Sequence, residues 1–236
     1  MSSPAKIIYV IVTSFFLAAF AIPLVGLGQK GDLRQFLDDV DERLSSIHSL
    51  TAHFDQTRTI GLTDETIKAT GKLYLRKPGK ILLDYTSPEP QKLLVKDSVV
   101  MIYLPSLKQV QRFSFEGSTE GKNLFVFWEP FSDLEKEFTI SAGRAKSTRL
   151  RYIELVPKKD ASVTGFSRLV LGIDPELRFP SVIEVEEIGG DVVKMVLSRI
   201  RIDPELDDSL FELDLGEGIE IIDYSEQHQS APGQLR

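Results

Sequence analysis

The residues most able to support catalysis or metal binding are three histidines, His48, His53 and His228. His48 and His53 are five positions apart where a helical pattern gives way to a strand pattern. Odd spacing on a strand would send them to opposite faces. No HExxH motif or acidic cluster accompanies them, and His228 falls in a polar tail. The histidines are therefore interpreted as surface or strand-edge residues.

Paired carboxylates are the next candidates, because two acids held together can do acid–base work or bind a metal. Asp38-Asp39, Glu186-Glu187 and Asp207-Asp208 are such pairs. Adjacent side chains on a strand point apart, which suits neither role. The sequence also lacks a nucleophile-elbow motif, a Walker loop and a dinucleotide-binding glycine motif. We therefore expect no enzyme, no catalytic residue, no metal and no cofactor.

Composition excludes further classes. The chain has 236 residues, a formal net charge of −7 and no cysteine. An acidic chain without a prominent basic patch is not expected to bind nucleic acid. The absence of cysteine excludes disulfides, thiolate chemistry and a lipid-modified N-terminal cysteine. A length of 236 residues allows one large domain.

Residues 1–28 have the composition of a secretory signal peptide. Lys6 precedes a strongly apolar run, and small residues around Ala19-Phe20-Ala21 or Gly26-Leu27-Gly28 offer cleavage sites. The uncharged run is also just long enough to span a bilayer, so an uncleaved anchor remains open. Either reading places the remainder outside the cytoplasm.

The elements that must position any site follow from periodicity. Apolar residues at helical spacing predict one helix over residues 32–47, with Asp32 as its N-cap. Period-two patterns then predict strands at residues 51–59, 66–76, 80–85, 91–96, 99–104, 109–115, 138–141, 149–157, 166–173, 179–187, 192–202 and 210–213. The connections are too short for helical crossovers, so the strands are expected to pair antiparallel.

These patterns predict a β-dominated α+β fold. A sheet of about eleven antiparallel strands tends to curl into an incomplete β-barrel. Its concave apolar face needs covering, and the available helices are the one at residues 32–47 and short aromatic ones within 117–138. Residues 223–236 are polar and are expected to form a loose tail.

One hairpin is unusual because its second strand is apolar on both faces. Residues 72–76 alternate, the turn Lys77-Pro78-Gly79-Lys80 follows, and the chain resumes as Ile81-Leu82-Leu83. The apolar residue on the second face, Leu82, needs a partner of its own. The sequence leaves open whether this is a partner protein or a loop of the same chain.

The order of short motifs resembles the LolA family of periplasmic lipoprotein carriers. The segments that carry the resemblance are Phe54-Asp55-Gln56, the turn region at residues 71–80, Ser87-Pro88-Glu89-Pro90-Gln91, residues 94–97, residues 101–110, Leu210-Phe211-Glu212-Leu213 and Gly218-Ile219-Glu220-Ile221. Each motif is weak alone, but their order and spacing extend over nearly all of a carrier domain at residues 30–222.

The resemblance implies a curved sheet whose helices act as a lid over an apolar cavity. It implies a monomeric carrier that receives lipoproteins from an inner-membrane ABC transporter and shelters their acyl chains. The carrier then delivers them to the outer-membrane receptor LolB. LolB itself needs an N-terminal cysteine, so this chain resembles the carrier.

The resemblance also implies roles for particular residues. The acyl-chain cavity would be lined by Leu73, Leu75, Ile81, Leu83, Met101 and Tyr103, and the lid by Phe125, Phe127 and Trp128. Relatives carry arginine before the turn proline, where it holds the lid closed. Lys77 occupies that position here, and lysine lacks the planar fork of arginine.

Two other functions remain open at this point. An envelope sensor on the same fold would be favoured by a retained N-terminal anchor. An exported hydrolase would require polar residues that converge in the fold without a recognisable motif.

Overall fold

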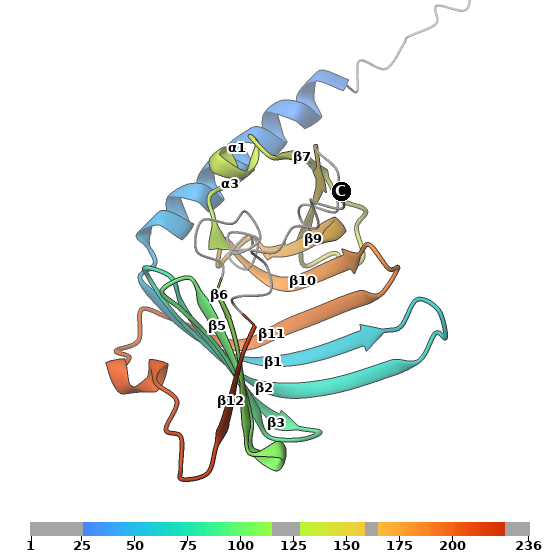
Figure 1. Ribbon diagram of the computed structural model, residues 1–236. Helices are drawn as coiled ribbons and strands as arrows, with labels where there is room; N and C mark the ends of the chain where they lie inside the picture. Colours follow the sequence, from blue (N-terminus) through green and yellow to red (C-terminus); the bar gives the residue numbers. More distant parts are fainter. Residues whose placement is uncertain (1–25, 115–127, 159–164, 225–236) are drawn as a thin grey trace, which may run out of the picture.

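The computed structural model describes residues 26–114, 128–158 and 165–224 of the chain (Figure 1). The elements in chain order are α1 (Gly26–Ser46), β1 (Ser49–Thr59), β2 (Thr66–Arg76), β3 (Lys80–Ser87), β4 (Gln91–Lys96), β5 (Val99–Leu104), η1 (Pro105–Leu107), β6 (Gln109–Ser114), α3 (Phe131–Leu134), β7 (Phe138–Ala142), β8 (Arg151–Pro157), β9 (Phe166–Asp174), β10 (Phe179–Glu187), β11 (Val192–Ile202), η3 (Asp208–Phe211) and β12 (Glu220–Asp223).

All twelve of these strands belong to one sheet. Its order is β12-β6-β5-β4-β3-β2-β1-β11-β10-β9-β8-β7, so most strands lie beside their neighbours in sequence. Two pairings are long-range: β1 pairs with β11 and joins the two halves of the meander, and β12 pairs with β6. The sheet is strongly curved and does not close, which confirms the β-dominated, incomplete barrel expected from the sequence (Figure 1).

The main core lies on the concave, inner face of the sheet. Every second residue of the strands points there, and α1 contributes its apolar stripe of Phe36, Leu37, Val40 and Leu44. All four are at least nine-tenths buried. Burial stabilises such side chains by about 1.5–3 kcal/mol each, which fixes the helix on the sheet. Figure 1 shows α1 and α3 together at the open side of the curved sheet.

A second, smaller cluster on the outer, convex face explains why β3 is apolar on both sides. Leu82 and Leu94 are covered there by Phe211 of η3, and all three are buried. Arg76 donates a hydrogen bond to the Leu206 carbonyl oxygen and forms an ion pair with Asp208. The partner of Leu82 is therefore a segment of the same chain.

Three details differ from the sequence-based expectations. Residues expected as a strand at 210–213 instead include the end of the 3-10 helix η3, because Phe211 must turn onto Leu82 and Leu94. The final strand is β12, and it pairs parallel to β6, so the sheet is not wholly antiparallel. Helix α1 begins before Asp32, whose carboxylate pairs with Arg151 instead of capping the helix.

The proposed signal segment lies largely outside the described residues, which begin at Gly26, and most of the proposed tail also lies outside them. Within the described ranges, no helix combines the length and the hydropathy needed to cross a bilayer.

The outer cluster generates a stability prediction. Phe211→Ala should lower the free energy of unfolding by about 3–5 kcal/mol, since it leaves a cavity over Leu82 and Leu94. Leu62→Ala is the control, because Leu62 is 92% exposed at a hairpin tip and its loss should change stability by less than about 0.5 kcal/mol. Urea denaturation of both variants measures the difference, and equal midpoints would contradict the packing role of Phe211.

Candidate functional site

The inner face of β1–β5 is built from transverse rows of directly paired residues. One row runs Leu50, Leu75, Ile81, Val95 and Val100 across five strands. Paired residues in a sheet share a face, so these five side chains form one continuous apolar band. All are buried, and they belong to the cluster that also contains the helix stripe.

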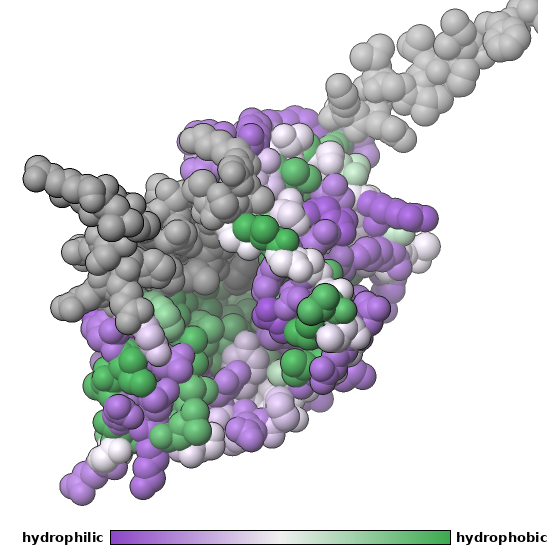
Figure 2. Space-filling view, turned by 45° about the vertical axis from the view of Figure 1, so that its right-hand side comes forward, coloured by the Kyte–Doolittle hydropathy of each residue, from purple (hydrophilic) through white to green (hydrophobic). Residues whose placement is uncertain are grey.

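The next row is apolar but much less covered. It runs Leu73, Leu83, Leu93 and Ile102 across β2–β5. Leu73 is 1% exposed, whereas Leu83, Leu93 and Ile102 are only partly buried. We call these three residues the open row. A space-filling view shows a recess in the surface with hydrophobic residues gathered along it (Figure 2).

An aromatic pair lies next to the open row, on the side away from Leu75 and Ile81. Phe54 and Tyr85 pack edge to face with ring centroids 4.9 Å apart. Gly71 lies beside them, because a Cβ there would come within 2.7 Å of the Phe54 ring. The Tyr85 hydroxyl donates a hydrogen bond of 2.9 Å to Gln56 Oε1, and burial raises the pKa of Tyr85. The Phe54–Tyr85 pair therefore marks the boundary of the aliphatic surface beyond Leu73, and it carries a polar hydroxyl group.

The helical cover is held together by polar contacts between its parts. The Asp41 carboxylate of α1 accepts hydrogen bonds from the backbone N–H groups of Phe131 and Ser132, at 2.6 and 3.0 Å. The first N–H groups of a helix lack partners within the helix, so the Asp41 carboxylate satisfies donors at the start of α3 that its N-cap residue, Pro130, leaves unpaired. Arg34 also pairs with Glu135 at 2.6 Å. Helix α1 and α3 thus behave as one unit over the sheet.

Trp128 lies beneath this cover in the main core. It is 4% exposed and packs edge to face on Phe179, with ring centroids 5.6 Å apart. Its indole Nε1 finds no hydrogen-bond partner in the part of the chain that the structure describes. Burying a donor without a hydrogen-bond partner costs about 1–3 kcal/mol.

Lys77 joins the β2–β3 turn to the helical cover. Its Nζ donates a hydrogen bond of 2.6 Å to the carbonyl oxygen of Leu44, near the end of α1, and lies 5.1 Å from the centroid of the Trp128 ring. The last carbonyls of a helix lack partners within the helix, and a cation there is favoured by the helix dipole. Burial lowers the pKa of Lys77, while Glu129 and Asp203 act in the opposite direction.

The structure brings together some of the residues suggested by the sequence and separates others. Leu73, Leu75, Ile81 and Trp128 are buried in the main cluster, and Leu83 packs against it. Met101 packs in the outer cluster instead, and Tyr103 shares its face. Placing these two on the inner face was wrong, because the β4–β5 register pairs Leu94 with Met101. Phe125 and Phe127 lie outside the described residues.

Sequence reasoning missed Leu93 and Ile102 of the open row. The sequence feature that could have placed them is the two-residue turn Asp97-Ser98, in which both residues have positive φ. Such turns fix a hairpin register, and this one pairs Lys96 with Val99 and therefore Leu93 with Ile102. Counting outward from that turn would have put Ile102, and not Met101, on the face of Leu93.

Comparison with known proteins gives a consistent family match. A family model described as outer membrane lipoprotein carrier protein LolA matches residues 45–214. The outer-membrane lipoprotein carrier protein of Methylococcus capsulatus is 26% identical over 191 residues, which covers 81% of this chain and 86% of that protein. The protein of the same description from Methylobacillus flagellatus is 25% identical over 178 residues and covers 75% and 83%.

A solved structure shows the same fold. An uncharacterized conserved protein from Thermus thermophilus superposes with a TM-score of 0.52 at 11% identity, over 81% of this chain and 99% of that one. At this identity the likeness concerns the fold alone.

The contact between Lys77 and α1 can be tested directly. Lys77→Met keeps the length of the side chain but removes the hydrogen bond to Leu44. Hydrogen bonds of charged groups contribute about 1.5–3 kcal/mol, so the amides at the end of α1 should exchange roughly tenfold faster or more in hydrogen-exchange measurements. Lys68→Met is the control, because Lys68 is exposed on the distal part of β2. Equal exchange rates in both variants would show that Lys77 does not stabilise the end of α1.

The lowered pKa of Lys77 predicts a pH dependence. Between the folded-state pKa and the usual value of 10.5, the unfolded chain binds more protons at this residue than the folded chain. The stability contribution of Lys77 should therefore rise with pH through this window and fall as pH is lowered. Urea denaturation from pH 7 upward should show the wild type gaining stability relative to Lys77→Met. A difference that is constant or declines would contradict the burial of the ammonium group.

Proposed function

Because the chain belongs to the LolA family of outer membrane lipoprotein carrier proteins, we propose that it carries lipoproteins by sheltering their acyl chains on the inner face of the sheet. The observation that supports this most directly is the open row of Leu83, Leu93 and Ile102. These residues are apolar, adjacent and only partly buried, whereas the neighbouring row that includes Leu75 and Ile81 is buried.

The physical need for such a surface follows from the cargo. Exposing an acyl chain to water costs about 0.8 kcal/mol per CH₂ group, so several long chains cost tens of kcal/mol. Apolar contact is non-directional, and it can accept chains of different length and position. A surface of aliphatic side chains from several strands can therefore hold the cargo without specific hydrogen bonds and still release it.

The helical cover would serve as the lid of this site. Opening it requires the Lys77–Leu44 hydrogen bond to break, because that bond joins the end of α1 to the β2–β3 turn. The unpaired Trp128 donor beneath the cover lowers the stability of the closed form. In this proposal, Lys77 is the latch, and acyl chains compete with α1 and Trp128 for the inner face.

We place this carrier in the periplasm, between an inner-membrane ABC transporter that loads it and an outer-membrane receptor, LolB or an equivalent, that unloads it. The signal-like composition of residues 1–28 supports export. The proposed carrier binds and transfers its cargo without catalysis or a cofactor. The energy for loading would come from ATP hydrolysis by the transporter. The cargo can be carried by one copy of the chain.

The open row predicts the effect of a charge on binding. Leu83→Glu should weaken binding of a fluorescent fatty-acyl probe at least tenfold, because a carboxylate beside acyl chains is poorly solvated. Val156→Glu is the control, since it adds the same charge at a half-exposed position of β8 outside the main core. The effect should appear in probe titrations and in the lipoprotein that copurifies from cells. Unchanged binding by folded Leu83→Glu would refute the inner-face site.

A further inference from the structure

A pocket on the outer face has no part in the proposed carrier site. It has a volume of about 290 Å³ and is lined by Thr51, Ala52, His53, Lys72, Tyr74, Arg199 and Arg201. These residues come from the three adjacent strands β1, β2 and β11. Except for Ala52, they alternate with inner-face residues such as Leu50, Phe54 and Leu73. We call it the convex pocket.

An irregularity in the β1–β11 pairing builds this pocket. Thr51 pairs with Arg201, but His53 pairs with Ser198, so β11 holds an extra residue opposite Ala52. Arg199 lies in this bulge with φ of +51°, a conformation that is uncommon for residues other than glycine. Bulges redirect side chains and are frequent beside functional sites. Here the bulge adds a second arginine to the pocket lined by Arg201.

Within the described ranges, the three cations of the convex pocket, Lys72, Arg199 and Arg201, form no ion pair or side-chain hydrogen bond. Asp84 lies directly opposite Lys72 on β3, but no ion pair joins the two side chains. The chain has 35 acidic and 28 basic residues, so carboxylates are not scarce.

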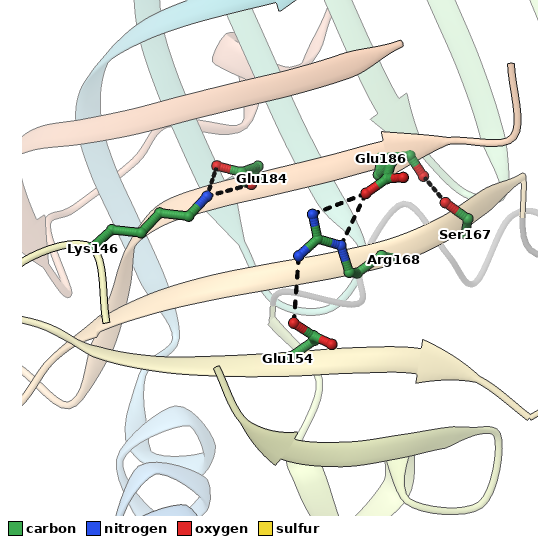
Figure 3. A network of polar contacts seen from close by, with 6 residues as sticks. All are labelled: Lys146, Glu154, Ser167, Arg168, Glu184 and Glu186. Atoms are coloured by element: carbon green, nitrogen blue, oxygen red, sulfur yellow. Dashed lines mark hydrogen bonds and ion pairs between the residues drawn. The ribbon is translucent and has the colours of Figure 1, made fainter. Parts of the chain in front are cut away.

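Two cations elsewhere on the outer face, Arg168 and Lys146, are neutralised by carboxylates. Arg168 pairs with Glu186 at 2.9 Å and with Glu154 at 3.4 Å, and Lys146 contacts both oxygens of Glu184 at 2.6 and 2.7 Å (Figure 3). The cations of the convex pocket make no such ion pair within the described ranges, although Asp84 lies opposite Lys72 in the ladder. An external anion would complete the pocket.

We propose that the convex pocket is a binding site for a phosphate ester. Three cations from two strands converge on it, and the hydroxyls of Thr51 and Tyr74 and the imidazole of His53 supply further polar groups. Phosphate offers more acceptor oxygens than a carboxylate, and arginine matches its geometry with paired donors. A volume of about 290 Å³ is at the lower limit for small-molecule sites, enough for phosphate with a small substituent such as glycerol.

This chemistry has two sources, a soluble phosphate ester and the headgroup of an anionic phospholipid. The pocket opens on the face opposite the open row, so a headgroup could bind there while acyl chains occupy the inner face. The inference does not depend on the proposed carrier function, because no residue of the convex pocket belongs to the acyl-chain site.

The test is titration calorimetry of the full mature chain with glycerol 3-phosphate, together with sedimentation with vesicles of phosphatidylglycerol or phosphatidylcholine. We expect glycerol 3-phosphate to bind and Arg199→Gln/Arg201→Gln to weaken it at least tenfold. Arg199 has a constrained backbone, so Lys72→Gln, on a regular strand, provides a second variant with the same expected direction. Arg144→Gln/Arg149→Gln removes two exposed charges outside the pocket and should bind normally.

The vesicles separate the sources. Binding to phosphatidylglycerol that glycerol 3-phosphate displaces identifies a headgroup, and binding of the soluble ester alone identifies a soluble ligand. The proposal is overturned if neither ligand binds, if the Arg144/Arg149 control loses as much affinity as the pocket variants, or if acetate and a polyglutamate peptide bind as tightly as the phosphate ester.

Discussion

The structure depends on the strand register that sends alternate residues to opposite faces of one curved sheet. In an antiparallel ladder, a shift of one residue exchanges the faces for a whole strand. The two-residue turn at Asp97-Ser98 fixes this register for β4 and β5. With the register set, Leu93 and Ile102 extend the inner apolar surface, while Leu94 and Met101 pack outside. Strands β3–β5 have apolar residues on both faces, and the register assigns each of these residues to one of two separate clusters.

The two apolar faces are covered in different ways. On the outer face, η3 places Phe211 over Leu82 and Leu94, and the cluster is closed by the chain itself. On the inner face, the row that includes Leu75 and Ile81 is buried in the same cluster as the α1 stripe, whereas the open row is only partly buried. Asp41 joins α1 to α3 within the cover, and Lys77 attaches α1 to the β2–β3 turn, in both cases through hydrogen bonds to backbone groups. The proposed opening of the lid would break these hydrogen bonds and expose the apolar stripe of α1, while the hydrogen bonds between the strands remain.

Much of this arrangement could be predicted from the sequence. Strong alternation in β1–β6 and β8–β11 placed these strands to within a few residues, and helical spacing from Leu33 to Leu44 identified the stripe of α1. The errors arose where tertiary contacts override local pattern. Residues 210–213 alternate like a strand, but Phe211 is drawn into a 3-10 turn by the outer cluster. Met101 and Tyr103 were misplaced because a face can be assigned only after the loop lengths on both sides are counted. The β11 bulge left no recognisable trace in the sequence.

The short strands at the two ends of the sheet limit how copies of this protein can associate. β7 has five residues and β12 has four, and these are the terminal strands of the sheet order. An edge strand is a template on which another chain can add, and long flat edges lead to fibrils. β12 pairs in parallel with residues 109–112 of β6. The four-residue β12 therefore forms the edge of the sheet in place of the six-residue β6. A protein with a large sheet is thereby protected against polymerisation, although its sheet never closes.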